Sequence, residues 1–404
     1  MSSAPRPSVL VIASLFPSAN RPVAGLFIRE RMFRVAERMP LCVVSPQPWF
    51  PLQGLIRRFR PNYRPPQPAH EMQQGIDVWF PRFLSLPGVA RWLDGFFMAF
   101  ACVRLVRRLR RERGVNLLDA HFAYPEGYAA TLLGRWLGLP VTITLRGTEV
   151  PLARDPARCK RKLRAIADAS RVFAVADSLK RHVVALGADP DKIRVVGNGV
   201  DCHKFFPVDR AQARQELGLP PGAKILISVG GLVERKGFHR VIELLPELVK
   251  RFPDLHYLIV GGACPEGDLT QFLKEMVKRL DLGERVHFLG ALPPEQLHKP
   301  LSAADVFVLA TANEGWANVF LEAMACGLPV VTTDVGGNRE VVCDDSLGAI
   351  TPFGEAAALK RAIAAALERD WDRDRIIAYA RENSWDTRVG MLLTDFGALA
   401  VRGV

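Results

Sequence analysis

Short apolar, β-branched runs alternate along this chain with longer segments whose apolar residues recur at helical spacing. In the first half, the runs predict strands at residues 9–13, 41–45, 117–121, 141–145, 171–175 and 193–196. Helices are predicted between them at residues 25–38, 126–137 and 178–185. This alternation is typical of parallel sheets that are covered by helices.

A second series begins after a change of composition at residues 207–221. It predicts strands at residues 224–229, 255–260, 285–289, 305–309 and 330–333, with a helix from Lys236. Glycines follow most of these strands, namely Gly230, Gly231, Gly261, Gly262, Gly290, Gly336 and Gly337. We therefore expect an α/β fold with two Rossmann-like doubly wound domains. Ligands of such folds bind at the carboxyl ends of the strands, so the cleft between the two domains is the expected site.

The domain boundaries follow from the same pattern. We place the first domain at residues 1–205 and the second at residues 206–384. A last helix at about 385–404 is expected to pack back onto the first domain. Residues 46–87 are rich in proline and arginine, and we interpret them as a long surface insertion.

The composition is that of a soluble globular protein, with 49% apolar and 24% charged residues among 404. The seven cysteines are scattered and contain no C-x-x-C pair, which argues against a disulfide framework and favours a reducing cytoplasm. The apolar run at residues 9–12 lacks the length and cleavage site of a signal peptide. No stretch reaches the ~20 apolar residues that a membrane-spanning helix needs.

The net charge of +12 is unevenly distributed. Residues 1–205 contain 32 Lys and Arg against 15 Asp and Glu, whereas the rest of the chain contains 22 against 27. The basic half can attract nucleic acid, anionic lipid or a phosphorylated substrate. Because the chain has no zinc finger, basic zipper or aromatic-interleaved RNA motif, we expect no nucleic-acid partner.

Two carboxylates stand eight positions apart in Glu314-Gly-Trp-Ala-Asn-Val-Phe-Leu-Glu322. Glu314 falls in the loop after an apolar strand, and Glu322 falls about one turn into the next helix. A helix start presents free N–H groups that suit a phosphate, and carboxylates beside it can accept hydrogen bonds from sugar hydroxyls. Taken singly, Glu314 could be a loop charge and Glu322 a first-turn residue that complements the helix dipole.

With the following Ala323-Met-Ala-Cys-Gly-Leu-Pro-Val330, this segment resembles the donor-site signature of retaining glycosyltransferases of family 4, which have the two-domain GT-B fold. The resemblance covers nearly the whole chain. Its other segments are Gly230-Gly-Leu-Val-Glu-Arg-Lys-Gly237, Asn198-Gly-Val-Asp201, Ala176-Asp-Ser178 and Gly25-Leu-Phe-Ile-Arg-Glu30. These motifs are specific for fold and reaction class, and say little about which sugar is transferred.

The resemblance implies roles for the second domain. Glu314 would contact hydroxyls of the donor sugar, and Glu322 would bind the ribose of the nucleotide. Gly231 and Gly290 would lie against the donor, with the base on backbone near Gly290. The backbone N–H groups of the turn after Glu314 would also face the donor; that turn contains Trp316, Ala317, Asn318 and Val319.

By the same resemblance, Arg235 and Lys236 would grip the diphosphate. Breaking a sugar–phosphate bond leaves charge on the nucleoside diphosphate, and fixed positive groups must stabilise it. Arginine offers a planar fork for two phosphate oxygens, and lysine offers a compact charge. The alternative is a solvated pair that opens a helix, a position where the helix dipole disfavours cations.

The first domain contributes five candidates. Gly25 would allow the backbone to approach the diphosphate, or is a glycine that simply opens a helix. His121 would touch the donor sugar. Arg146 replaces a histidine that relatives often have, and would bind the acceptor or the diphosphate. Ser178 and Asn198 are weaker candidates, since the Asn198-Gly pair can also be a tight turn.

No Asp-x-Asp follows an apolar strand, as metal-dependent sugar transferases of the other major fold require. A match at Asp372-Arg-Asp374 lies in a charged helical tail. We therefore expect no metal and no cofactor, with Arg235 and Lys236 in the metal's place. Retention without an obvious nucleophile implies, by resemblance, attack on the front face, with the departing phosphate accepting the acceptor's proton.

The expected function is transfer of a sugar from a nucleotide donor, UDP in preference to GDP, to a glycan or lipid-linked acceptor in cell-surface polysaccharide or glycolipid synthesis. A nucleotide-sugar epimerase of the same fold, a phosphorylase and a non-catalytic sugar-nucleotide or lipid-binding protein remain alternatives. The expected location is the cytoplasm, with contact to the inner face of the membrane left open.

Residues 92–113 bear on that contact. Apolar residues fall on one helical face, namely Trp92, Phe96, Phe100, Val103 and Val106. Arginines crowd the last turns, at positions 104, 107, 108, 110, 111 and 113. The segment is either a domain helix with a cationic end that suits its dipole, or a patch that meets anionic lipid together with the arginines near residue 58.

Overall fold

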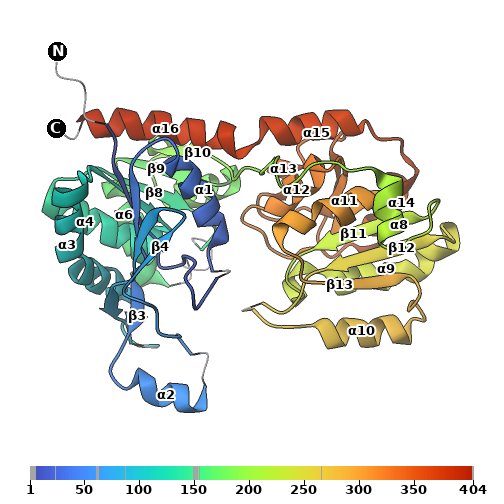
Figure 1. The fold of residues 1–404 in the computed structure, drawn as a ribbon, viewed down its shortest axis with the longest axis horizontal. Coiled ribbons are helices and arrows are strands. Elements are labelled where there is room, and N and C mark those ends of the chain that lie inside the picture. The colour runs from blue at the N-terminus through green and yellow to red at the C-terminus, as the bar shows by residue number, and fades with distance from the viewer. Residues whose placement is uncertain are drawn as a thin grey trace. The chain divides into compact units, whose positions relative to one another are not determined.

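The computed structural model describes residues 6–402, apart from 23, 61–62, 87, 149–152, 154 and 265. The chain divides into two compact units (Figure 1). Unit 1 contains Met1–Asn198 and Arg388–Val404, and unit 2 contains Gly199–Thr387. The boundary placed from the sequence at residue 205 thus lies beyond the observed one. Each unit is described by itself.

Within the described residues, unit 1 holds an eight-stranded sheet with the order β10-β9-β8-β7-β1-β2-β5-β4. Every neighbouring pair is parallel except β4 and β5. The strands are β1 (Val9–Ile12), β2 (Leu41–Val44), β4 (His70–Gln73), β5 (Ile76–Trp79), β7 (Leu117–His121), β8 (Val141–Leu145), β9 (Arg171–Ala174) and β10 (Ile193–Val195).

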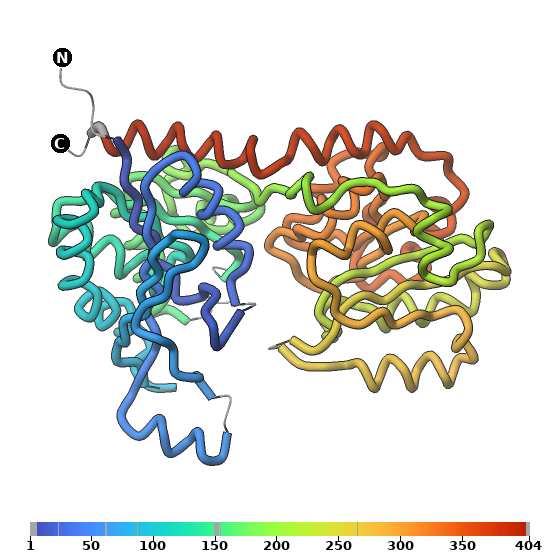
Figure 2. Tube along the Cα trace, viewed as in Figure 1, coloured from blue at the N-terminus to red at the C-terminus, as the bar shows by residue number. Residues whose placement is uncertain are grey.

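The helices of unit 1 are α1 (Leu26–Ala36), α2 (Gln53–Phe59), α3 (Asp94–Arg113), α4 (Tyr128–Leu137), α6 (Pro156–Asp168), α7 (Asp177–Ala185) and the greater part of α16 (Trp385–Arg402). α2 lies away from the sheet (Figure 1). Residues 389–396 of α16 share a core with β1 and α1, and the ring of Phe396 lies 6.0 Å from that of Phe173. Figure 2 shows this C-terminal segment in red. Asp395 of the same helix pairs with Arg194 at 2.7 Å.

The interpretation of residues 46–87 as a surface insertion was wrong in part. β5 adds to the main sheet beside β2, and β4 pairs with β5 at the edge. The other two strands of the segment, β3 (Gln47–Trp49) and β6 (Arg82–Leu84), form a small parallel sheet. β5 was not predicted from the sequence, because the charged Asp77 interrupts its apolar run. Asp77 is nonetheless buried, since its carboxylate contacts His70 and Arg113, each at 2.7 Å.

Unit 2 holds a six-stranded sheet in the described residues, with the order β13-β12-β11-β14-β15-β16 and every pair parallel. The strands are β11 (Lys224–Val229), β12 (Leu255–Val260), β13 (Val286–Gly290), β14 (Val306–Leu309), β15 (Val330–Thr333) and β16 (Gly348–Thr351). The helices are α8 (Arg210–Glu216), α9 (Phe238–Arg251), α10 (Thr270–Arg279), α11 (His298–Ala303), α12 (Asn318–Ala325), α13 (Asn338–Val341), α14 (Ala356–Glu368) and α15 (Arg373–Glu382).

Two apolar cores lie on opposite faces of the unit 2 sheet. One contains Ile227 and Phe307 with Phe320 of α12, and the other contains Leu226 and Val308 of the same two strands. Alternate residues of β11 and β14 therefore enter different cores, as in any parallel sheet that is covered on both faces. The expected α/β fold with two doubly wound domains is confirmed. Across the described residues, no helix combines the length and the apolarity needed to cross a membrane.

Candidate active site

Glu314 is held by three donors that converge on one of its oxygens. Its Oε1 accepts hydrogen bonds from Lys236 Nζ at 2.7 Å, Thr311 Oγ1 at 3.1 Å and Arg235 Nη1 at 3.2 Å. No hydrogen bond to Oε2 is made within the described part of the chain. The residue is 8% exposed and lies in the loop after β14, as predicted. One carboxylate oxygen thus anchors the cations, and the other is left for a ligand.

The two cations lie in a short turn that follows β11. Arg235 and Lys236 end a 3-10 turn (Glu234–Lys236), so α9 begins two residues later than predicted. The turn is tied to the Glu314 loop, because the Ala312 N–H donates to the Arg235 carbonyl at 2.8 Å and Arg235 Nη1 donates to the Asn313 carbonyl at 3.0 Å. Two loops that follow neighbouring strands therefore bring both cations to the Glu314 carboxylate.

Glu266 was missed by the sequence interpretation. Its carboxylate receives two hydrogen bonds from Arg235, at 2.7 and 3.0 Å. This bidentate contact raises the pKa of Arg235 and lowers the pKa of Glu266. No local pattern marks Glu266, although its place shortly after β12 and two glycines puts it at the carboxyl edge of the sheet. Arg235 is thereby shared between two carboxylates, whereas Lys236 contacts Glu314.

The backbone of Glu314 rests on a glycine. Gly336, in the loop after β15, has a φ of 53°, and a Cβ there would lie 1.6 Å from the Glu314 carbonyl oxygen. The neighbouring Gly337 N–H donates to the same oxygen at 3.4 Å. Any side chain at Gly336 would therefore push the Glu314 loop away.

The predicted turn with Trp316, Ala317, Asn318 and Val319 leads into α12. Ala317 is the N-cap residue and makes no side-chain capping bond, and Asn318 begins the helix. Glu322 lies about one turn further along and is partly buried. A helix start that lacks a capping side chain is a suitable place for an anionic or polar ligand group.

The two remaining glycines of this unit lie at the same edge of the sheet. Gly231 follows β11, and a Cβ there would lie 2.9 Å from Cys264 Sγ. Gly290 ends β13 with a φ of 73° and is exposed. The structure therefore gathers all the second-domain candidates at the carboxyl edge of the unit 2 sheet, and their contacts with a donor remain predictions.

In unit 1, the structure brings together three of the five candidates. Arg146 Nε donates to His121 Nδ1 at 2.9 Å, and Arg146 Nη1 donates to Asn198 Oδ1 at 3.2 Å. The guanidinium also lies 5.0 Å from the centre of the Phe27 ring. His121 ends β7 and Arg146 follows β8, so these side chains also lie at the carboxyl edge of their sheet.

His121 is completely buried, with 0% exposure, and its Nδ1 is in contact with Arg146. Burial, and then the charge of Arg146, lower the pKa of His121 to about 4. The imidazole is therefore neutral near pH 7. Because Nδ1 accepts from Arg146, the ring proton is on Nε2, which lies 3.2 Å from Asp119 Oδ2. A direct contact between His121 and a sugar would need the buried imidazole to become exposed.

Arg31 of α1 is a second residue that the sequence did not single out. It is 0% exposed, and its Nη2 donates to the Val196 carbonyl at 3.4 Å. Its Nε and Nη1 find no hydrogen-bond partner among the described residues. Burial lowers its pKa to about 10. The sequence could have indicated its burial, because Arg31 lies three residues after Ile28 and directly before Met32 on the buried face of α1.

Gly25 and Ser178 are the other two candidates of unit 1. Gly25 has a φ of 69°, and a Cβ there would lie 2.2 Å from the Leu15 carbonyl oxygen. The close approach of the Leu15 backbone is therefore enough to require glycine at position 25. Ser178 is the second residue of α7.

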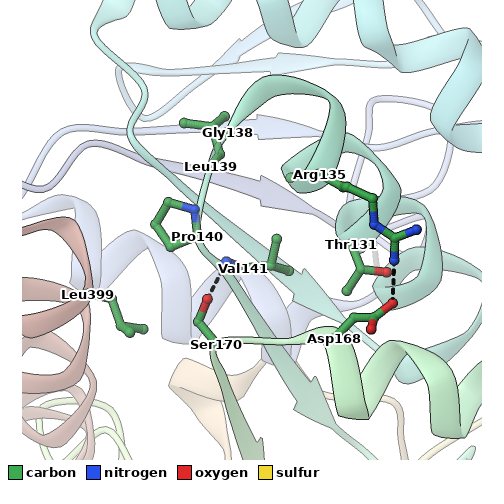
Figure 3. A pocket seen from close by; sticks show the side chains of 10 residues that line it. Thr131, Arg135, Gly138, Leu139, Pro140, Val141, Asp168, Ser170 and Leu399 are labelled. Atoms are coloured by element: carbon green, nitrogen blue, oxygen red, sulfur yellow. Dashed lines mark hydrogen bonds and ion pairs between the residues drawn. The ribbon is translucent and has the colours of Figure 1, made fainter. Parts of the chain in front are cut away.

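A cavity of unit 1 lies elsewhere in the fold. It measures about 580 Å³ and is lined by Val141 at the start of β8 and by Ser170 just before β9 (Figure 3). Arg135 and Asp168 pair across its rim at 2.6 Å. These residues lie at the amino ends of the strands, opposite the edge that holds His121 and Arg146. Doubly wound folds bind ligands at the carboxyl edge, so this cavity is not the candidate active site.

The expectation that no metal takes part stays a prediction. Over the described ranges, no three or more His, Cys, Asp or Glu side chains are grouped so as to hold a metal ion. The Asp372-Arg-Asp374 match lies at the start of α15, where Asp372 is the N-cap and accepts a hydrogen bond from the Arg375 N–H.

Solved structures share this fold over nearly the full chain. Sucrose-phosphate synthase from Thermosynechococcus elongatus aligns with a TM-score of 0.72 at 22% identity, over 98% of this chain and 97% of that one. The Anabaena protein HepE in complex with UDP also aligns with a TM-score of 0.72, at 19% identity over 97% of this chain and 100% of that one. The two doubly wound units therefore define a protein with the GT-B fold.

The family follows from the sequence matches. Residues 209–383 match the model of the glycosyl transferases group 1, and residues 35–204 match that of glycosyltransferase family 4. A D-inositol 3-phosphate glycosyltransferase from Actinosynnema mirum is 33% identical over 76% of this chain and 78% of its own length. The putative teichuronic acid biosynthesis glycosyltransferase TuaC from Bacillus subtilis is 28% identical over 81% of both chains. The chain belongs to the group 1 glycosyltransferases of family 4, and is a glycosyltransferase.

Proposed function

We propose that this glycosyltransferase moves a sugar, with retention of configuration, from a UDP-sugar to a glycan or lipid-linked acceptor in cell-surface polysaccharide or glycolipid synthesis. The observation that carries the proposal is the convergence of Lys236 and Arg235 on Oε1 of Glu314, at 2.7 and 3.2 Å. This arrangement places two cations beside a carboxylate whose Oε2 makes no hydrogen bond with the described residues. The cations suit a diphosphate, and Oε2 suits a hydroxyl of the sugar linked to it.

The preference for UDP and for a cell-surface product draws support from relatives. HepE was solved with UDP and with UDP-glucose. The relative TuaC is named for the synthesis of teichuronic acid, and several others are named for glycosyl transfer to D-inositol 3-phosphate. These names favour a UDP-sugar over a GDP-sugar, and a glycan or glycolipid product.

The cations would stabilise the leaving group. As the bond between the sugar C1 and the phosphate oxygen breaks, negative charge develops on the diphosphate, and Lys236 and Arg235 are placed to neutralise it. The acceptor oxygen forms its bond to C1 on the same face, and its proton passes to the departing phosphate oxygen. This mechanism needs no protein base. Because Lys236 and Arg235 would neutralise the charge that a metal ion neutralises in other sugar transferases, we expect metal-independent transfer.

The carboxylates would orient the donor. Oε2 of Glu314 can accept a hydrogen bond from a sugar hydroxyl while Oε1 keeps its three donors. Glu322 would bind the ribose hydroxyls. The N–H groups at the start of α12 would complete the sugar site, and Gly231 and Gly290 would let the backbone lie against the nucleotide.

Unit 1 would bind the acceptor. Arg146 is held by His121 and Asn198 in a fixed position at the carboxyl edge of its sheet. We assign it to an acceptor or diphosphate oxygen, and His121 to holding it there or to contact with the sugar. Gly25 and Ser178 remain candidates for the loops around that edge.

A peripheral contact with anionic membrane, from the cytoplasm, is supported by the surface of α3. Phe96 and Phe100 of this helix are exposed, Phe100 by 70%, and Trp92 just before it is exposed as well. Arginines follow toward its C-terminal end. Apolar side chains beside arginines are the usual composition of a surface that lies on anionic lipid.

The test is a panel of nucleotide sugars, scored by release of nucleoside diphosphate with and without EDTA. Slow hydrolysis often reports the donor without any acceptor. We expect release of UDP from a UDP-sugar, unaffected by EDTA. Conversion of the donor to an isomer would favour the epimerase alternative. Tight nucleotide binding with no product would favour a non-catalytic protein, and loss of activity in EDTA would contradict metal independence.

A further inference from the structure

Unit 1 contains a second, smaller cavity of about 100 Å³ between the segments that follow β1, β2 and β5. Four arginines line it, namely Arg21, Arg57, Arg64 and Arg82, and no aspartate or glutamate does. Pockets that hold an entire small molecule measure roughly 300–1,000 Å³. This one therefore has the size of a subsite for one group of a larger ligand.

The positive charge of this cavity is offset only at a distance, by the electrostatic interaction of Arg64 with the buried Asp94 carboxyl. None of the four arginines lies within salt-bridge distance of a carboxylate in the described parts of the chain. Elsewhere in the same unit the arginines are often paired, for example Arg34 with Glu30 at 2.8 Å and Arg135 with Asp168 at 2.6 Å. Like charges gathered around a concave surface raise the local concentration of anions.

Two of the arginines are fixed by the backbone, and the other two are not. Arg57 donates to the carbonyls of Tyr63 and Arg64, at 3.2 and 2.7 Å, and Arg64 Nη1 donates to the Ser85 carbonyl at 3.2 Å. The side chains of Arg21 and Arg82 make no hydrogen bond within the described residues. The cavity thus combines a rigid cationic wall with two guanidinium groups that are available to a ligand.

Gln53 adds a specific polar group to the wall. It is only 5% exposed, and its Oε1 is buried with no hydrogen-bond partner among the described residues. A buried amide oxygen without a donor is costly, unless a ligand supplies one. Trp49 lines the same cavity and offers an aromatic face. An anionic group on a hydroxylated ring would satisfy the arginines, the amide and the indole together.

The position of the cavity connects it with the reaction. It lies beyond the carboxyl ends of β1, β2 and β5, which are neighbours in the sheet. His121 and Arg146 follow β7 and β8 at the same edge of that sheet. A ligand that reaches from this cavity toward Arg146 would stay on the face of the fold where substrates bind.

We infer that this cavity binds an anionic group, a phosphate or a carboxylate, of the sugar acceptor. The inference rests on the proposed function, because it assigns the acceptor to unit 1. The Arg21 and Arg82 guanidinium groups bind the anion's oxygens, Arg57 and Arg64 supply the surrounding positive charge, and Gln53 accepts a hydroxyl hydrogen bond. The acceptor is therefore an acidic glycan or a phosphate-linked sugar, not a neutral one.

The test titrates the full-length protein with inorganic pyrophosphate, with glucuronate and with phosphatidylglycerol vesicles. The fluorescence of Trp49, obtained as the difference from a Trp49→Phe variant, reports the cavity. The charge is removed with the double variant Arg21→Gln/Arg82→Gln, whose side chains make no hydrogen bond that the fold needs. Arg38→Gln is the matched control, since Arg38 is an exposed arginine of the same unit outside the cavity.

We expect pyrophosphate or glucuronate to change the Trp49 signal, with affinity roughly tenfold or more weaker in the double variant and unchanged in Arg38→Gln. Equal affinity in wild type and the double variant would overturn the inference, as would the absence of any signal with both soluble anions. A response to vesicles alone would also overturn it, because the cavity would then serve a membrane surface. UDP binding is measured separately, so that a failed donor assignment is recognised independently.

Discussion

Glu314 shows how one side chain can serve two purposes. Its Oε1 accepts hydrogen bonds from Lys236 and Arg235, and its Oε2 makes no hydrogen bond with the described residues. Arg235 is further restrained by Glu266. In the proposed function, the cations would turn toward a bound diphosphate without being released into solvent, so the charge needed at the transition state would already be in place.

This view predicts the effect of Glu314→Gln. The amide keeps the shape but loses the charge that positions the cations, so we expect kcat to fall roughly tenfold to hundredfold while UDP binding persists. Glu266→Gln is the matched control, because it removes a carboxylate from Arg235 but leaves Lys236 and Glu314 paired. Steady-state kinetics with the donor found in the panel measures both. Equal losses in the two variants would contradict the role given to Glu314.

His121 predicts a dependence of stability on pH. Its pKa is lowered to about 4 in the folded protein, against a usual value of 6.5. Between these two pKa values, the unfolded chain binds a proton at His121 that the folded chain does not bind. The contribution of His121 to the free energy of unfolding is therefore complete above pH 6.5 and is lost as the pH falls toward 4. At about 1.36 kcal/mol per pKa unit, the loss is roughly 3 kcal/mol.

Urea unfolding at about pH 7 and about pH 4.5 measures this effect. The fall in the free energy of unfolding between the two should be smaller in His121→Asn than in wild type. His203→Asn removes an exposed histidine and serves as the control. The same fall in wild type and His121→Asn would show that His121 does not titrate as described.

At the residue level, the motifs named most residues of the candidate site, but the sequence could not supply their contacts. The resemblance placed Glu314 and Lys236 in one site, although 78 residues separate them. Glu266 and Arg31 were not predicted as site residues, because the sequence does not distinguish a buried charged residue from a solvated one in a loop or on a helix. Only the fold shows that Arg31 is enclosed.

At the level of elements, strands that are buried on both faces were predictable to within one residue at each end. Their continuous apolar runs, such as Lys224–Val229 and Leu255–Val260, leave little choice of structure. β5 was missed because buried ion pairs let Asp77 sit in a strand. The start of α9 was misplaced because Gly237, with a φ of 76°, ends a separate turn that no periodicity reveals.

Gly336 offers a test at this level. A Cβ there would overlap the Glu314 carbonyl, so Gly336→Ala should lower the free energy of unfolding by about 2–4 kcal/mol. Gly138 has a similar φ of 62°, but nothing lies within 4 Å of the position that a Cβ would occupy, so Gly138→Ala should cost only about 1–2 kcal/mol. Denaturant unfolding compares them. A cost no larger in Gly336→Ala would mean that the Glu314 loop does not depend on this glycine.

At the level of the whole molecule, the charge is concentrated in one half. Residues 1–205 have 17 more Lys and Arg than Asp and Glu, from 32 against 15. Some of this charge surrounds the small arginine-lined cavity, and some lies along α3 beside exposed Phe96 and Phe100. The sequence revealed the excess but not its division between these two places, because that division depends on which side chains the fold exposes.

The α3 surface predicts co-sedimentation with anionic vesicles at low salt, with binding that weakens as salt is added. Phe96→Ser/Phe100→Ser should reduce the bound fraction several-fold, because it removes apolar area from the interface. Phe272→Ser is the control, since Phe272 is an exposed phenylalanine of unit 2. Absence of binding by the wild type at low salt would refute the membrane contact.

The central claim, that Lys236 and Arg235 stabilise the leaving diphosphate, is tested most directly by the kcat of Lys236→Ala with the nucleotide sugar that the wild type uses. Loss of the charge at 2.7 Å from Glu314 should lower kcat by roughly 10²-fold or more. Lys250→Ala, at the exposed end of α9, should keep wild-type turnover. Near-normal turnover in Lys236→Ala would contradict the account.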